Sequence, residues 1–213
     1  MKAHSIVRNE IGLRGPLKED IMRRIAIATL LGASLAVMTA PANAAWKSYV
    51  SHKFGFSFEA PGEVKVQNGT YRGQISGPQQ TIVYRSVEDN IEYKVTLMPS
   101  FKQAQAEGAN ILGERAYNFQ NEKKVLMDTF GRVEPGKDSI YGRKITVEQP
   151  NNGGRTTAAF YFNNGTLYSL EATVLPANGD YASPDPGRFI DSIVFVLTRT
   201  QPGATELTMP PEE

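Results

Sequence analysis

The chain of 213 residues contains no cysteine, one tryptophan and two histidines, His4 and His52. Without cysteine it has no disulfides, no thiol nucleophile, no cysteine-ligated metal and no lipid-bearing cysteine at an export signal. The position of the histidines excludes the His-Glu-x-x-His motif of zinc hydrolases. His52, the one histidine after residue 44, is interpreted as a surface or core residue rather than a catalytic base.

Other signatures of catalysis are also missing. The sequence has no Gly-x-Ser-x-Gly elbow, no Walker-type phosphate loop and no dinucleotide fingerprint. The acid pairs Glu88-Asp89 and Glu212-Glu213 fall in a predicted turn and in the tail, where no apolar pocket could raise a carboxyl pKa. Residues 128–138 lack the alternating oxygens of a calcium loop. We therefore predict no catalytic residue, no cofactor and no metal, and a protein that is not an enzyme.

Charge is low and balanced, with 23 basic and 22 acidic residues. The first 44 residues hold six of the basic and three of the acidic ones, which leaves a net charge of about −2 on the rest. Such a balance gives no electrostatic footprint for nucleic acid or for an anionic membrane surface.

The segment Met22 to Ala44 has the three parts of a secretory signal peptide. Met22-Arg23-Arg24 is a positive start, residues 25–38 form an apolar run, and Ala42-Asn43-Ala44 is a small-x-small cleavage site. The run is shorter than the ~20 residues that span a bilayer, so we predict cleavage between Ala44 and Ala45 and no retained membrane span. The predicted location is the periplasm.

Two questions about this leader stay open at the level of sequence. Arg23-Arg24 also fits a twin-arginine export signal, although no Phe-Leu pair follows it. Residues 1–21 are polar and unpatterned, so translation could start at Met1 or at Met22. We expect three parts in the chain: a leader (1–44), one domain (45–198) and a disordered, proline-rich tail (199–213).

The strongest structural signal is a hairpin within residues 155–174. Two β-prone runs flank Asn164-Gly165, the pair that suits a type I′ turn because both residues need positive φ. This turn predicts that Phe162 faces Leu167 and that Tyr161 faces Tyr168. One face of the pair would then carry six apolar residues: Ala159, Tyr161, Tyr168, Leu170, Ala172 and Val174. Because Phe160, Phe162 and Leu167 fill the other face, we expect the sheet to be covered on both sides.

Further strands are predicted along the chain from alternating patterns and turn residues. Residues 91–97 alternate strictly, and a second type I′ turn is predicted at Asn68-Gly69. The other predicted strands are 46–50, 54–60, 64–66, 71–76, 80–87, 125–133 and 139–148.

Two helices are predicted. Residues 102–120 place apolar side chains at helical spacing after a candidate N-cap, Ser100, although Gly108 and Gly113 weaken the pattern. Residues 183–196 begin with Ser-Pro-Asp-Pro, which supplies an N-cap, a proline in the first turn and an acid near the helix N-terminus. Strands that outnumber helices and are joined by tight turns indicate an α+β domain with a central, mainly antiparallel sheet and one helix on each face.

One group of side chains suggests an interaction surface. If the strand 139–148 pairs with the strand 157–162, then Tyr141, Arg143, Tyr161 and Tyr168 lie near one another, and Tyr and Arg are enriched at interface hot spots. The alternative is that these tyrosines are half-buried sheet positions with solvated hydroxyl groups.

Two motifs resemble PsbP-like domains, the family of photosystem II extrinsic proteins and of a small Ran-binding import factor. The first is Phe54-Gly55-Phe56-Ser57-Phe58-Glu59-Ala60-Pro61-Gly62, which is similar to the opening of these domains. The second is Gly187 to Phe195, which looks like their terminal helix. The resemblance covers residues 46–197 and implies an α/β/α sandwich and a non-enzymatic binding or assembly role. It transfers no functional residue.

Our first hypothesis is accordingly an exported, non-enzymatic module that binds a protein partner through a sheet face or edge. A second is a carrier of an apolar small molecule between sheet and helix, which requires an enclosed pocket. A third is a hydrolase with an unrecognised carboxylate pair. The partner and the oligomeric state do not follow from the sequence.

Overall fold

The computed structural model describes residues 45–99, 101, 105–133, 139–195 and 202–210, with the side chains of 105–107 left out. These residues belong to one compact unit, 43–213. Within them the chain forms eleven strands, two α-helices and a 3-10 turn in the following order. The elements are β1 (Trp46–Ser51), β2 (Phe56–Pro61), β3 (Lys65–Gly73), β4 (Gly77–Glu88), β5 (Ile91–Met98), α2 (Gln105–Gln120), β6 (Lys124–Val133), β7 (Ile140–Glu148), η1 (Pro150–Asn152), β8 (Arg155–Asn163), β9 (Thr166–Val174), α3 (Asp185–Asp191), β10 (Val194–Phe195) and β11 (Thr205–Glu206).

The predicted hairpin is present as β8 and β9. Asn164 and Gly165 have φ of 48° and 74°, as a type I′ turn requires. Phe162 pairs with Leu167, and Tyr161 pairs with Tyr168. The turn therefore sets the register of the hairpin, and the prediction made for it is confirmed.

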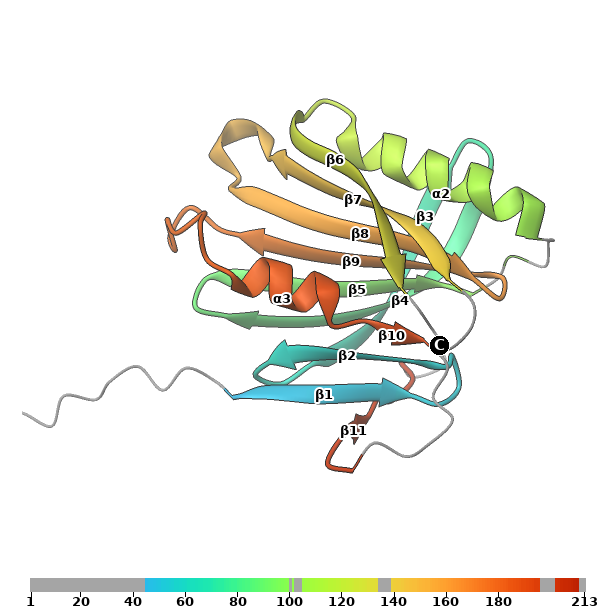
Figure 1. Cartoon of the computed structure of the whole chain (residues 1–213), viewed down its shortest axis with the longest axis horizontal. Coiled ribbons are helices and arrows are strands. Elements are labelled where there is room, and N and C mark those ends of the chain that lie inside the picture. Colours follow the sequence, from blue (N-terminus) through green and yellow to red (C-terminus); the bar gives the residue numbers. More distant parts are fainter. Residues whose placement is uncertain (1–44, 100, 102–104, 134–138, 196–201, 211–213) are drawn as a thin grey trace, which may run out of the picture. The chain divides into compact units, whose positions relative to one another are not determined.

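Seven of the described strands form one antiparallel sheet, the large sheet, in the order β3-β4-β5-β9-β8-β7-β6. The hairpin β8–β9 lies inside this sheet, and β3 and β6 are its two edges (Figure 1). Phe160 packs on one side of the sheet with Phe119 and Ile145, whereas Tyr161 lies in a separate core on the other side. Both faces are covered, as the sequence predicted.

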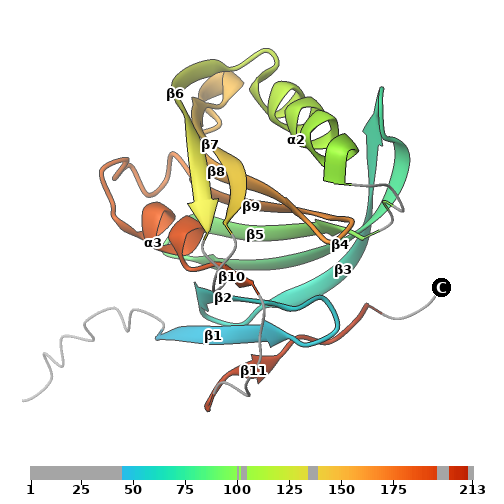
Figure 2. The same cartoon turned by 45° about the vertical axis from the view of Figure 1, so that its right-hand side comes forward.

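Helix α2 covers the first face, and the sheet curves around it (Figure 2). Its Phe119 ring meets the Phe160 ring edge-on, with centroids 5.2 Å apart. Gly108, which weakened the prediction of this helix, lies so close to the Phe162 ring that a Cβ there would overlap it. The glycine is therefore explained by close packing of the helix on the hairpin.

Helix α3 and a second sheet cover the other face. This small sheet has the order β10-β2-β1-β11 among the described strands, with β11 parallel to β1. Aromatic rings fill the space between the two sheets: Tyr168 lies 5.4 Å from Phe56 and 4.9 Å from Phe195, measured between ring centroids. The α+β class is thus confirmed, with mainly antiparallel sheets and two helices in the described part.

The sequence predicted a single sheet with one helix on each face, but the described residues form two sheets. The strands β1 and β2 leave the large sheet and share its second face with α3. Helix α3 ends at Asp191 instead of continuing to Val196, because the next residues pair with β2: Val194 with Ser57 and Phe195 with Phe56. A tertiary contact thus ends the helix where the local pattern would extend it.

The turn predicted at Asn68-Gly69 was also wrong. These residues lie inside β3, where Asn68 pairs with Ile82 and Gly69 with Thr81 of β4. The strand continues to Gly73, and the chain reverses between there and Gly77. Pairing along all nine residues of β3 outweighs the local preference of an Asn-Gly pair for a turn.

Part of the predicted tail is ordered. Thr205 and Glu206 form β11, the Leu207 amide donates a hydrogen bond of 2.7 Å to the Val50 carbonyl, and the Leu207 side chain is 9% exposed. The prediction of disorder was wrong for this stretch because a buried leucine and backbone pairing compensate for its loss of entropy.

Several sequence predictions lie outside the described residues. They are the signal peptide and its cleavage site (1–44), the N-cap at Ser100, the turn at 134–138 and the tail at 199–201 and 211–213. In the part of the chain that the structure describes, no helix is long and apolar enough to cross a membrane.

Candidate functional site

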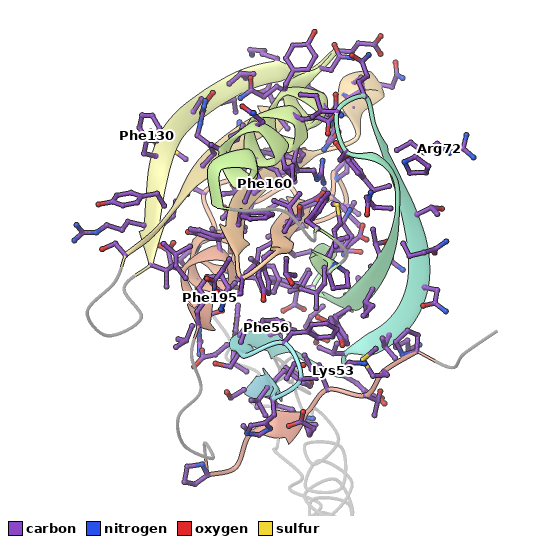
Figure 3. All side chains as sticks on the ribbon, turned by 90° about the vertical axis from the view of Figure 1, so that its right-hand side faces the viewer. Lys53, Phe56, Arg72, Phe130, Phe160 and Phe195 are labelled. Carbon is purple, nitrogen blue, oxygen red and sulfur yellow. The ribbon has the colours of Figure 1, made fainter. Side chains whose placement is uncertain are left out.

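The edge strand β6 carries the most exposed large hydrophobic side chain of the described residues. Its outer side has no strand neighbour among the described residues, and Phe130 near its middle is 83% exposed. Figure 3 shows Phe130 on the outside of the strand, away from the buried Phe160. Next to it in the sheet, Tyr141 on β7 is 64% exposed. Two large exposed rings beside a free strand edge are features of a binding surface.

Arg143 holds Phe130 and Asp128 together. Its Nη2 donates hydrogen bonds of 2.6 and 2.5 Å to the two carboxylate oxygens of Asp128, and its Nε donates one of 3.0 Å to Oδ1. The guanidinium also lies over the Phe130 ring, 5.5 Å from its centroid. Gln120, at the end of α2, donates a further hydrogen bond of 2.7 Å to Asp128. The exposed ring is therefore held in place, which lowers the entropy that a partner must remove.

The same contacts set the protonation of Asp128. The hydrogen bonds from Arg143 are the largest influence and lower the pKa of Asp128 below its ordinary value, with the bond from Gln120 adding to the effect against partial burial. The carboxylate stays charged through the neutral range. Asp128 and Arg143 therefore form an ion pair beside Phe130.

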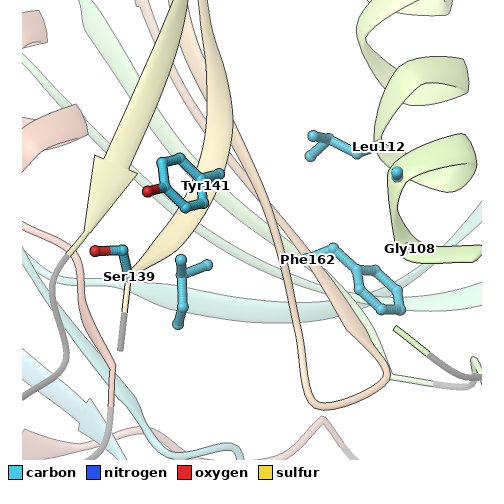
Figure 4. Close-up of a pocket in the computed structure, with 7 residues that line it drawn as sticks. Gly108, Leu112, Ser139, Tyr141 and Phe162 are labelled. Carbon is cyan, nitrogen blue, oxygen red and sulfur yellow. The ribbon is translucent and has the colours of Figure 1, made fainter. Parts of the chain in front are cut away.

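A groove lies beside Tyr141, between the start of α2 and the strands β7 and β8 (Figure 4). Its volume is about 210 Å³, and its lining residues are Gly108, Ala109, Leu112, Ser139, Ile140, Tyr141 and Phe162. This volume accommodates one side chain of a partner but is smaller than the ~300–1,000 Å³ of typical small-molecule sites. The groove extends the aromatic surface from β6 towards α2.

The four residues predicted as an interaction surface do not lie on one face. Tyr141 and Arg143 are on the face that α2 covers, next to Phe130. Tyr161 and Tyr168 point to the other face and are buried in the core. Burial raises the pKa of each of these two tyrosines to about 12. The predicted strand pairing is present, with Gly142 opposite Tyr161, but alternation puts neighbouring side chains on opposite sides.

Phe130 was missed at the level of sequence, although its parity in the strand marks it. It shares a face with Asp128 and Arg132, whereas Met127, Thr129 and Val133 belong to the other parity. A register shift between Val125 and Met127 separates this regular part of β6 from the first residues of the strand. An aromatic residue that lies between two charged residues on one face of a strand is expected to be exposed to solvent.

The two buried acids of the described interior are both held by donors: Glu114 accepts hydrogen bonds from the backbone N–H groups of Ile75 and Ser76, and Glu171 pairs with basic side chains. Glu171 lies under α2 and accepts hydrogen bonds from Arg115 at 2.6 Å and from Lys94 at 3.0 Å. Burial raises its pKa, but Arg115 and Lys94 together outweigh burial and lower it below the ordinary value. His52 is exposed beside Glu206. Within the described ranges no group of acids and histidines could hold a metal ion.

Apart from the groove at the start of α2, side chains fill the space between α2 and the large sheet in the described part. Two clusters occupy it in the described part, one around Phe160 and one around Phe162. The carrier hypothesis requires an enclosed apolar pocket at this place, so the observed packing argues against it.

Comparisons with known proteins give distant likenesses only. No family model matches the sequence, and no curated protein matches it. The solution structure of cyanobacterial PsbP (CyanoP) from Synechocystis sp. PCC 6803 is similar at 13% identity and a TM-score of 0.48, over 73% of this chain and 95% of that chain. Protein PA94 of unknown function from Pseudomonas aeruginosa is similar at 12% identity and a TM-score of 0.34, over 73% of this chain and 99% of that one.

Neither likeness is close enough to support a family or a function. The resemblance to PsbP-like domains therefore remains a resemblance, and the α+β class rests on the arrangement of strands and helices described above. The site likewise rests on its own geometry.

Proposed function

We propose that the protein is an exported, non-enzymatic binding or assembly module that pairs an extended segment of a partner protein with the free edge of β6. The observation that carries this proposal is the exposed Phe130 at that edge, fixed by Arg143 and adjacent to Tyr141. Strand addition of this kind obtains affinity from backbone hydrogen bonds and specificity from side chains on alternate positions.

The edge has only some of the devices that proteins use to prevent strand pairing, namely the charges of Lys124, Asp128 and Arg132 and the register shift between Val125 and Met127. Proline, inward-pointing charge and covering helices are typical protections of an edge strand. The described strand β6 has no proline, and its Val125, Leu126 and Met127 are each about 40% exposed. The opposite edge, β3, has a more polar sequence, with Lys65, Asn68 and Arg72. The difference between the two described edges is therefore in exposed apolar side chains, which β6 has and β3 lacks, and such side chains favour strand binding at β6.

The predicted signal peptide supports a location in the periplasm, where the absence of cysteine leaves stability to the core alone. The carrier of an apolar molecule is the second candidate, and the filled space under α2 weighs against it. The hydrolase is the third, and the pairing of Glu171 with Arg115 and Lys94 weighs against that.

Site-specific photocrosslinking tests the proposal. A photoreactive phenylalanine analogue replaces Phe130 in one variant and Tyr117 in a control, because Tyr117 is a similarly exposed aromatic residue on α2. In periplasmic extract, position 130 should give a defined adduct that position 117 does not. Mass spectrometry should place the crosslinked peptide in a β-prone segment of the partner.

Equal labelling at both positions, or no adduct at position 130, would contradict strand binding at β6. An adduct that maps to a second copy of this chain would instead identify the partner considered next.

A further inference from the structure

We propose that the segment bound at β6 is the β6 strand of a second copy, so that two chains form an antiparallel pair about a twofold axis at Phe130. This inference rests on the proposed function, because it uses the same edge and names the partner. The large sheet would then continue from one chain into the other.

The sequence of β6 is complementary to itself in this register. In an antiparallel pair centred on Phe130, the residue two positions before the centre faces the residue two positions after it in the other chain. Asp128, which Arg143 of its own chain already binds, therefore faces Arg132 of the second copy, and this happens twice by symmetry. Phe130 faces its own equivalent, and Met127 faces Val133. Opposite charges and apolar groups that face each other directly stabilise a strand pair.

Other centres of symmetry fit less well. Centring on Asp128 places two carboxylates against each other and Lys124 against Arg132, and directly opposed like charges are destabilising. Centring on Thr129 places Asp128 against Phe130. That register also places Arg132 against Leu126, so neither charge gains an opposite partner, and Phe130 is the favoured centre of the three.

The structure also limits the length of the pairing. The register shift between Val125 and Met127 ends the regular edge on one side, so about seven residues from Met127 to Val133 can pair. A contact of one strand buries less than the ~1,200 Å² of a stable interface, so the dimer should be weak and dependent on concentration. The contact would cover the Phe130 ring that is exposed in the single chain.

Because the chain has no cysteine, a single introduced cysteine is its one thiol, and any disulfide between two chains must form at that position. Directly opposed residues of an antiparallel pair have Cβ atoms ~4.5–5.5 Å apart, near the range that a disulfide bridges. The purified Phe130→Cys variant should therefore form a disulfide-linked dimer under mild oxidation. The control Thr70→Cys, at an exposed position of the edge strand β3, should stay monomeric or react far more slowly.

Mixing two cysteine variants tests which residues of the two β6 strands face each other. Asp128→Cys and Arg132→Cys should each crosslink poorly alone and efficiently when mixed. Efficient crosslinking of either variant alone, or none in the mixture, would overturn the proposed register.

Charge exchange provides an independent measurement by sedimentation velocity over a range of concentrations. Arg132→Asp and Asp128→Arg should each weaken self-association at least tenfold, since each brings like charges together. Their mixture should form the heterodimer, in which both charge pairs are opposite again. Circular dichroism confirms that each variant is folded.

Monomeric wild-type protein at all concentrations, together with no disulfide from Phe130→Cys, would overturn the homodimer. If photocrosslinking at position 130 then still captures a different protein, the binding function at β6 stands and only the identity of the partner is wrong. If it captures nothing, both proposals fail.

Discussion

Arg143 contacts two groups that differ in chemistry, the Asp128 carboxylate and the Phe130 ring, and it fixes both at the edge of the large sheet. Phe130 is thus an exposed aromatic side chain with a contact to a neighbouring arginine. A held aromatic ring beside unpaired backbone loses little entropy on binding.

Replacing Phe130 with alanine should weaken self-association, measured by sedimentation velocity, with little effect on folding. The ring is 83% exposed, so the free energy of unfolding should fall by less than about 1 kcal/mol, mainly through the lost contact with Arg143. The matched control is Phe160→Ala, a ring buried on the same face, which should cost about 3–5 kcal/mol. Urea unfolding measures both. A large loss of stability in Phe130→Ala would show that the ring is structural.

Replacing Glu171 with glutamine should destabilise the protein by about 3 kcal/mol, because Arg115 of α2 loses its carboxylate partner in a buried place. The control is Glu92→Gln, an acid paired with Arg85 near the surface, for which a change of about 0–1 kcal/mol is expected. Equal effects of the two substitutions in urea unfolding would contradict this ranking.

The pH dependence follows from the lowered pKa of Glu171. Arg115 and Lys94 stabilise the charged form in the folded state against the opposing effect of burial. Its contribution to stability is therefore present above the ordinary value of 4.5 and is lost as pH falls from there through the lower folded pKa. Urea unfolding at pH 6 and at pH 3.5 should show a smaller loss of stability in Glu171→Gln than in the wild type.

Among the elements, the β8–β9 hairpin has its register set by the two residues of its turn. Gly165 has φ of 74°, and a Cβ there would lie 2.5 Å from the Phe101 carbonyl oxygen. Replacing it with alanine should therefore destabilise the protein by more than about 1 kcal/mol. In the control Gly187→Ala, nothing lies within 4 Å of the new Cβ in α3, so stability should stay equal or rise by up to about 1 kcal/mol. Thermal unfolding compares them, and a neutral Gly165→Ala would contradict the turn assignment.

The order of the C-terminal segment, in contrast, depends on contacts with residues at the start of the domain. Leu207→Ala should cost about 2 kcal/mol, because the side chain is buried and its amide is bonded to Val50. Met209→Ala, at an exposed position two residues later, should change stability by less than about 0.5 kcal/mol. Slow hydrogen exchange at the Leu207 amide is expected as well. Fast exchange and no loss of stability would restore the prediction of a disordered tail.

At the scale of the whole molecule, export is the prediction that the described residues leave untested. Intact mass spectrometry of protein recovered from the periplasm should give a chain that starts at Ala45. A charged residue at the small-x-small site, Ala44→Arg, should block processing and give a larger, membrane-associated precursor. Recovery of the full chain from the cytoplasm would contradict the signal peptide.

The sequence by itself determined the β8–β9 hairpin, its register, the strict alternation of β5 and the α+β class. These features depend on residues that are neighbours in the chain, where turn geometry and side-chain parity act directly. Only the tertiary structure decided that β1 and β2 form a second sheet, that α3 ends at Asp191 and that Asn68-Gly69 lies within a strand.

The candidate site divides in the same way. Tyr141 and Arg143 were predicted and lie at the site, but Tyr161 and Tyr168 are buried, and Phe130 is identified only by its place on an edge strand. Which strand is last in a sheet depends on pairing between distant segments. That pairing energy is not contained in any local pattern of the chain.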